Sequence, residues 1–150
     1  MSAAFFCILF TLRATLLSGD TVKRFLCLFT IGGLGYNVIE WLWRGYSHWS
    51  MFFLGGTCFH IIGRIGERLR GRGALAVATA CSAAVTAAEF LCGCLVNLHW
   101  KLNVWDYSRK FANLRGQICL LYSVLWGCLS LIAVPLYRSV NRLLWRGSGH

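Results

Sequence analysis

Long apolar segments separated by short polar ones dominate the chain. Within each segment the apolar residues are continuous and do not alternate with polar ones, which favours helices and argues against a β-barrel. A helix needs about 20 predominantly apolar residues to cross a bilayer. The pattern therefore predicts a bundle of four transmembrane helices at about residues 25–43, 50–65, 74–98 and 116–137.

The N-terminal residues form a further apolar stretch. Residues 3–17 are apolar except for a few small polar residues and Arg13. They lack the basic segment and small-residue cleavage pattern of a signal peptide. Arg13 would lie deep in the bilayer if this stretch crossed it. We therefore expect residues 3–17 to be retained as a hydrophobic helix, either at the membrane interface or as a fifth helix of the bundle.

Composition agrees with a membrane protein. Of the 150 residues, 57% are hydrophobic and 13% are charged, whereas a soluble domain has about 25% charged residues. The 16 glycines and seven tryptophans suit closely packed helices with aromatic side chains at the interfaces. We predict an all-α integral membrane protein in which residues 1–150 form a single membrane domain.

Basic residues predict the orientation of the bundle. For four spans, the side with more basic residues carries Lys23, Arg24, Arg64, Arg68, Arg70, Arg72, Arg138, Arg142 and Arg146. The other side carries Arg44, Lys101, Arg109, Lys110 and Arg115. Because basic residues favour the cytoplasm, the C-terminus is predicted inside and the loop 100–115 outside. Topology and anionic lipid account for the net charge of +10, so we expect the lipid bilayer as partner and no nucleic acid.

Glu89 is the only charged residue in the predicted span 74–98. A charge at the bilayer centre costs about 3 kcal/mol on insertion scales. Ser82 and Thr86 precede Glu89, and Gly93 and Asn97 follow it. Successive members are three or four residues apart, which places all five on one helix face. This polar stripe is expected to face the bundle interior or a cavity.

Two other spans carry polar residues with open interpretations. Glu40 and Arg44 form an i,i+4 pair at the end of the first span. The pair is either an interfacial salt bridge or the outer mouth of a polar pathway. His60 is either a packing residue or a proton relay.

Two outer segments combine aromatic with polar side chains. The first contains His48 and Trp49, and the second contains Trp105, Asp106, Tyr107 and, at its end, Gln117. Such residues usually anchor helices at the membrane boundary. The alternative is a lid or a headgroup-binding loop over the pathway.

Several chemistries find no support in the sequence. There is no P-loop, no HExxH motif and no Cys/His quartet. Most of the eight cysteines lie in apolar segments, where thiols behave as small hydrophobic groups. We expect no metal, no cofactor and no catalytic residue. The weakest alternative is a membrane enzyme that acts on lipid-linked substrates through His48, Asp106 or the glutamates.

Ordered motifs across most of the chain resemble one bacterial family. They are residues 40–51, Gly55 with Gly56, Glu89 with Phe90, Gly93, Val96 and Asn97, then 103–108, Asn113 with 116–120, and Trp126. Residues 29–137 are similar to the ABC-transporter permease family, CmpB-like, type IV. The resemblance implies a multi-pass protein of the bacterial inner membrane that serves as the membrane component of a transporter, with a possible separate ATPase subunit.

These observations give one leading hypothesis and two alternatives. The leading one is a permease-like subunit in which Glu89, Asn97, Thr86 and Glu40 line a polar route for a cation or small polar solute. The alternatives are a structural or regulatory membrane module, whose buried glutamates hold the helices in register, and a stand-alone proton-coupled small exporter.

A bundle this small is expected to work as a homo-oligomer. Contact would run along the first helix, which is rich in glycine, or along a stripe of small residues on the third, namely Ala76, Ala80, Ala84 and Ala88.

Overall fold

The computed structural model describes residues 19–145. Its helices are α2 (Gly19–Arg44), α3 (Trp49–Arg68), α4 (Ala74–Gly93) and α5 (Leu120–Trp145). A π-helical segment, η1 (Cys94–His99), continues α4, and a hairpin of β1 (Asn113–Leu114) and β2 (Ile118–Cys119) precedes α5. The hydrophobic helix predicted at residues 3–17 lies outside the described residues, within which there are four α-helices and not five.

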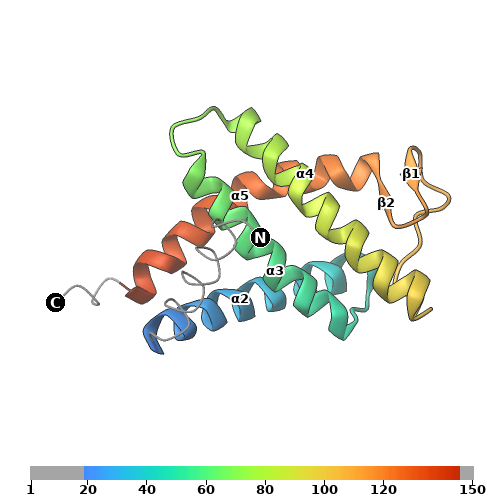
Figure 1. Ribbon diagram of the computed structural model, residues 1–150, viewed down its shortest axis with the longest axis horizontal. Helices are drawn as coiled ribbons and strands as arrows, with labels where there is room; N and C mark the ends of the chain where they lie inside the picture. The colour runs from blue at the N-terminus through green and yellow to red at the C-terminus, as the bar shows by residue number, and fades with distance from the viewer. Residues whose placement is uncertain (1–18, 146–150) are drawn as a thin grey trace, which may run out of the picture.

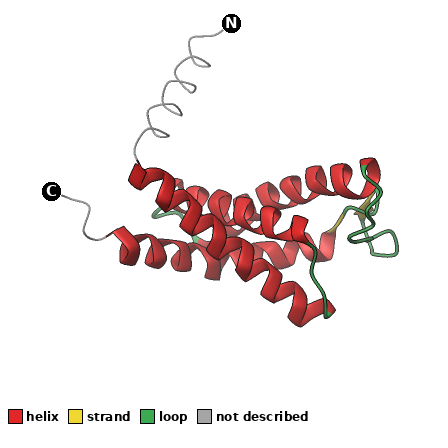
Figure 2. Cartoon of the chain, turned by 90° about the horizontal axis from the view of Figure 1, so that it is seen from below, coloured by secondary structure: helices red, strands yellow, loops and turns green. Residues whose placement is uncertain are grey.

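Consecutive helices run in opposite directions, so their ends alternate between the two ends of the bundle (Figure 1). The hairpin lies at the end where α2 finishes and α3 begins, and α5 finishes at the opposite end (Figure 2). The two predicted groups of basic residues therefore lie at opposite ends, apart from Arg146, which is outside the described residues.

Within residues 19–145, three helices are long and apolar enough to cross a membrane: Thr21–Arg44, Ala74–His99 and Leu120–Leu144. The chain is therefore a multi-pass membrane protein. The predicted span at 50–65 is not among them, because His60, Arg64 and several glycines lower the hydropathy of α3. Half of the 20 residues of α3 are buried, so its neighbours cover much of its surface. The last span begins at Leu120, later than the predicted residue 116, because residues 113–119 form the hairpin.

Glycines bring α2 and α3 into close contact. A Cβ on Gly33 would lie 2.6 Å from the backbone oxygen of Phe52, and one on Gly56 would lie 2.7 Å from that of Phe29. Gly32 of α2 lies equally close to α3, and Gly55 of α3 lies equally close to α2. Gly32 and Gly33 of α2 thus serve contact within one chain, whereas contact between copies along the first helix stays a prediction.

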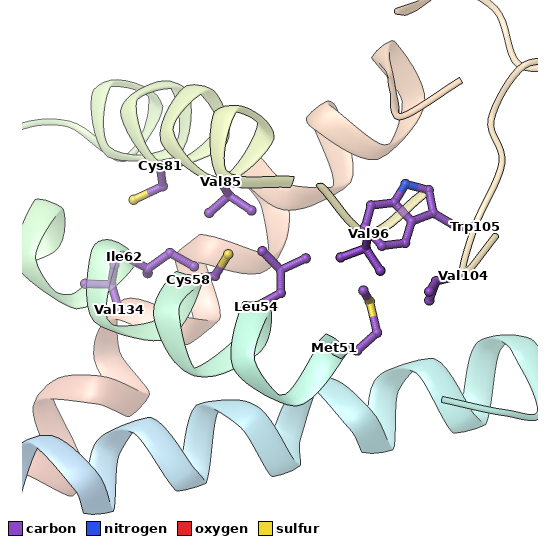
Figure 3. Close-up of a cluster of buried hydrophobic side chains, with 10 residues drawn as sticks. All are labelled: Met51, Leu54, Cys58, Ile62, Cys81, Val85, Val96, Val104, Trp105 and Val134. Atoms are coloured by element: carbon purple, nitrogen blue, oxygen red, sulfur yellow. The ribbon is translucent and has the colours of Figure 1, made fainter. Parts of the chain in front are cut away.

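The main hydrophobic core extends along α3 to the outer loop (Figure 3). Leu54, Cys58 and Ile62 of α3 lie opposite Cys81 and Val85 of α4. At the outer end the core continues into the loop after η1 through Val96, Val104 and Trp105. The buried thiols pack as small apolar groups, as predicted. On α4 the buried stripe is Cys81, Val85, Glu89 and Gly93, whereas Ala76 is exposed.

Candidate functional site

Glu89 is almost completely buried, with 2% of its surface exposed. The hydroxyl of Tyr107 donates to its Oε1 at 3.2 Å, and the indole Nε1 of Trp126 donates to its Oε2 at 3.0 Å. None of the ion pairs among the described residues involves Glu89. The prediction that this carboxyl group faces the bundle is confirmed, and its partners come from the outer loop and from α5.

Aromatic stacking positions both donors. The ring of Tyr36 stacks on Trp126 with centroids 5.4 Å apart, and the ring of Tyr122 stacks on Tyr107 at 4.6 Å. Burial, and next the nearby Glu89 carboxylate, raise the pKa of Tyr107 well above its usual range. The phenol therefore stays protonated and can act as a hydrogen-bond donor at every physiological pH.

Asn97 fixes the outer loop above this site. Its Nδ2 donates to the backbone oxygen of Trp105 at 3.0 Å and to Oε1 of Gln117 at 2.8 Å, and its Oδ1 accepts from the backbone nitrogen of Val104 at 2.7 Å. The indole of Trp105 donates to the backbone oxygen of Gln117 at 2.9 Å. Gly93 allows this approach, because a Cβ there would lie 2.6 Å from Oε1 of Gln117. These contacts hold the loop that carries Tyr107.

We expect Asn97→Ala to loosen the loop 100–117. The substitution leaves the buried N–H of Val104 without an acceptor, which costs about 1–3 kcal/mol. Limited trypsin cleavage at Lys101, Arg109 or Lys110 should become about tenfold faster, the equivalent of about 1.4 kcal/mol in local opening. Asn37→Ala, which removes an amide outside this network, should leave cleavage unchanged. Equal cleavage of the two variants would contradict the assigned role of Asn97.

Glu40 and Arg44 form the second polar feature, at the outer end of α2. Nη2 of Arg44 lies 3.3 Å from Oε1 of Glu40 and donates to the backbone oxygen of Val104 at 3.1 Å. Ser47 donates to Oε2 of Glu40 at 2.9 Å. The guanidinium group also lies over the ring of Tyr46, 4.7 Å from its centroid. The predicted i,i+4 pair is therefore present and is linked to the outer loop.

A half-open groove of about 370 Å³ lies between α2 and α5. Glu40 and Arg44 line it, together with aliphatic side chains and a set of aromatic ones, Tyr36, Trp43, Tyr107, Tyr122 and Trp126. Glu89 is not among its lining residues, although both of its hydrogen-bond donors are. Tyr107 and Trp126 thus separate Glu89 from the groove.

The remaining predicted residues lie away from the groove. Thr86 donates to the hydroxyl of Ser123 at 3.0 Å and so links α4 to α5. The ring of His60 stacks on Phe25 with centroids 4.3 Å apart, and its Nε2 lies 3.0 Å from the backbone oxygen of the same residue. These contacts are those of packing residues, and neither side chain reaches the two glutamates.

The outer-loop residues are separated in the same way. His48 caps α3, accepting from the backbone nitrogen of Ser50 at 3.3 Å. Trp49 is exposed. Asp106 accepts from the backbone nitrogen of Ser108 at 2.8 Å, and this bond is the main cause of its lowered pKa. Tyr107 alone among the predicted outer-segment residues lines the groove.

Sequence reasoning did not propose the groove aromatics on α2 and α5 as site residues. Trp43, Tyr122 and Trp126 each resemble the aromatic side chains that anchor membrane helices. Tyr36 is at a spacing of four from Gly32 and Glu40, and that spacing was the available signal. Only the approach of α5 to α2 distinguishes these side chains from ordinary interfacial aromatics.

Comparison with known proteins supports the family suggested by the sequence motifs. A family model described as "Putative ABC-transporter type IV" matches residues 3–146, nearly the full chain. No curated protein and no solved structure matches the chain. The four α-helices of the described part of the chain, three of them able to span a membrane, agree with a membrane component. The chain belongs to the Putative ABC-transporter type IV family.

Proposed function

We propose that this chain is the permease-like membrane subunit of an ABC transporter and that its solute route follows the groove between α2 and α5. The observation that carries the proposal is the Glu40–Arg44 pair, which faces a groove between two helices able to span the membrane. A charged pair in such a place is costly unless it has a function or a partner.

Glu89 has a secondary role in this proposal, because it does not face the groove in the described arrangement. It lies directly behind Tyr107 and Trp126 and would reach the groove if Tyr107 moved with the outer loop. The prediction that Glu89, Asn97 and Thr86 line a pathway for a cation or small polar solute depends on such a movement. In the described arrangement Asn97 and Thr86 bond to other parts of the protein, so Glu40 and Arg44 take the solute-facing role.

The proposal includes a partner and a location. A separate ATPase subunit would supply ATP hydrolysis, because the sequence has no P-loop. The bacterial inner membrane is the proposed location, with the end that carries Arg64, Arg68 and Arg142 in the cytoplasm. Two copies of the chain would enclose the half-open groove better than one.

Copurification with transport measurements tests the proposal. The tagged full chain, extracted from bacterial membranes in mild detergent, is expected to carry a P-loop ATPase subunit and to hydrolyse ATP after reconstitution. In energised vesicles screened with small ions and polar solutes, Glu40→Gln should reduce uptake about tenfold, or about 1.4 kcal/mol. Thr79→Val, which changes an exposed side chain of α4 away from the groove, is the control and should leave uptake unchanged. A lone homo-oligomer without ATPase would contradict the proposal and favour the proton-coupled exporter.

One observation favours a second candidate, a structural or regulatory membrane module. Both carboxylate oxygens of Glu89 are occupied by donors from other segments, as expected of a residue that holds helices in register. In that case Glu40→Gln and Glu89→Gln would both leave flux unchanged, and only variants that break the hydrogen bonds of Glu89 would lower stability.

A further inference from the structure

We propose that the groove between α2 and α5 binds a membrane phospholipid, with its phosphodiester at Arg44 and one acyl chain along the two helices. The inference rests on the proposed function in that it names the class of molecule that occupies the same groove. It replaces the cation or small polar solute with a phospholipid as the molecule that occupies the groove.

The first argument comes from Arg44. Its Nη2 is satisfied by Glu40 and Val104, but its Nε is buried and is the one buried side-chain polar atom among the described residues without a hydrogen-bond partner. Leaving a buried charged donor unpaired is costly. Phosphate oxygens suit the planar guanidinium fork. A turn of the Arg44 side chain toward the groove would expose Nε, and a phosphodiester there would then supply the missing acceptor.

The second argument is the order of polarity along the groove. Since α2 and α5 run in opposite directions (Figure 1), Arg44 at the end of α2 lies near the start of α5, where Tyr122 is found. Further into the membrane the lining changes to Leu125, Leu129 and Ile132. A phospholipid has the same order, with a charged head at the boundary and an apolar chain toward the bilayer centre.

The third argument is the shape of the groove. A volume of about 370 Å³ is at the lower end of the range for small-molecule sites. This size suits one chain of a lipid whose second chain stays in the bilayer, and a half-open groove between two spanning helices permits that arrangement. A free ion would need polar ligands along the route, whereas most of the lining is aromatic or aliphatic.

Charge supports a phosphate-bearing head. Glu40 and Arg44 cancel each other, and the outer loop adds the exposed basic residues Lys101, Arg109, Lys110 and Arg115 against the single acidic residue Asp106. A small cation would meet Arg44 in the groove itself. A zwitterionic phospholipid adds no net charge beside the neutral pair.

Photocrosslinking of the purified full chain tests the inference. The probe is phosphatidylethanolamine with a diazirine in mid-chain, and crosslinked residues are located by mass spectrometry. We expect labelling of groove residues such as Leu125 and Ile132. Arg44→Lys, which removes the guanidinium fork, and Leu129→Trp, which fills the inner groove, should each reduce this labelling about tenfold. Leu121→Trp, on an exposed part of α5 outside the groove, is the matched control, and circular dichroism verifies that each variant is folded.

Competition separates the possible ligands. Unlabelled phosphatidylethanolamine is expected to abolish groove labelling, whereas equal concentrations of glycerol phosphate or diacylglycerol should not. Equal competition by glycerol phosphate would identify a plain phosphate site. Equal competition by diacylglycerol would show that Arg44 does not bind the phospholipid headgroup. Either result would overturn the inference, as would even labelling of all exposed apolar faces, including Leu143. The measurement requires neither ATPase nor flux, so its failure is distinct from failure of the proposed transport function.

Discussion

Glu89→Ala is expected to lower the free energy of unfolding by about 2–4 kcal/mol. The substitution removes the acceptors of Tyr107 and Trp126 and leaves a cavity between α4, α5 and the outer loop. Tyr107 and Trp126 also line a mainly apolar groove that offers few other acceptors, so each is left with an unmet hydrogen bond. Denaturation in mixed micelles, followed by tryptophan fluorescence, measures the change.

Two further variants isolate the cause of this effect. Glu89→Gln keeps the shape of the side chain; its carbonyl can accept from Trp126, and its amide can donate to the hydroxyl oxygen of Tyr107. We expect it to remain within about 1 kcal/mol of the wild type. Leu91→Ala, on an exposed face of the same helix, controls for the truncation itself. If Glu89→Ala were no more destabilising than Leu91→Ala, the hydrogen-bond network would not stabilise the fold.

Gly56→Val should separate α2 from α3 and destabilise the protein by about 1–3 kcal/mol. A Cβ at this position meets the backbone oxygen of Phe29 at 2.7 Å, and a backbone atom cannot turn away as a side chain can. Close approach of this kind supplies much of the packing energy between membrane helices. The same micelle denaturation measures the loss, and a fluorescence distance between labels on α2 and α3 measures the separation.

Gly35→Ala is the matched control for the glycine contacts between α2 and α3. No atom lies within 4 Å of a Cβ at Gly35, so the substitution creates no clash. Alanine also favours a helix over glycine by about 1 kcal/mol. We therefore expect equal or higher stability. A similar loss of stability in both variants would show that general sensitivity of the helices, and not contact between α2 and α3, causes the effect.

The positions of the helices could be predicted from the sequence because apolar length is a local property. The third span agrees with α4 and η1 together to within one residue, whereas α2 begins six residues before the predicted start of the first span and ends one residue after its predicted end. The start of α5 could not be predicted. Arg115 and Gly116 adopt positive φ angles in a turn, but the apolar residues beside this turn have the pattern of a helix. For α3, the apolar length alone did not reveal that other helices cover it.

The polar stripe on α4 could also be predicted, because residues three and four apart share a helix face. Its inward direction followed from the cost of a lipid-facing carboxylate. The partners of Glu89 could not be predicted. Tyr107 follows it by 18 residues and Trp126 by 37, and the intervening loop and turns set their approach.

The sequence by itself determined that this is a helical membrane protein with one glutamate in each of two predicted spans and an inward-facing polar stripe. These properties follow from hydropathy and helical periodicity, which depend only on neighbouring residues. Only the tertiary structure decided that Glu40 and Arg44 face the groove while Glu89 lies behind Tyr107 and Trp126. The packing of α2, α4 and α5 and the path of the outer loop set that arrangement, because they bring together side chains that no local pattern connects.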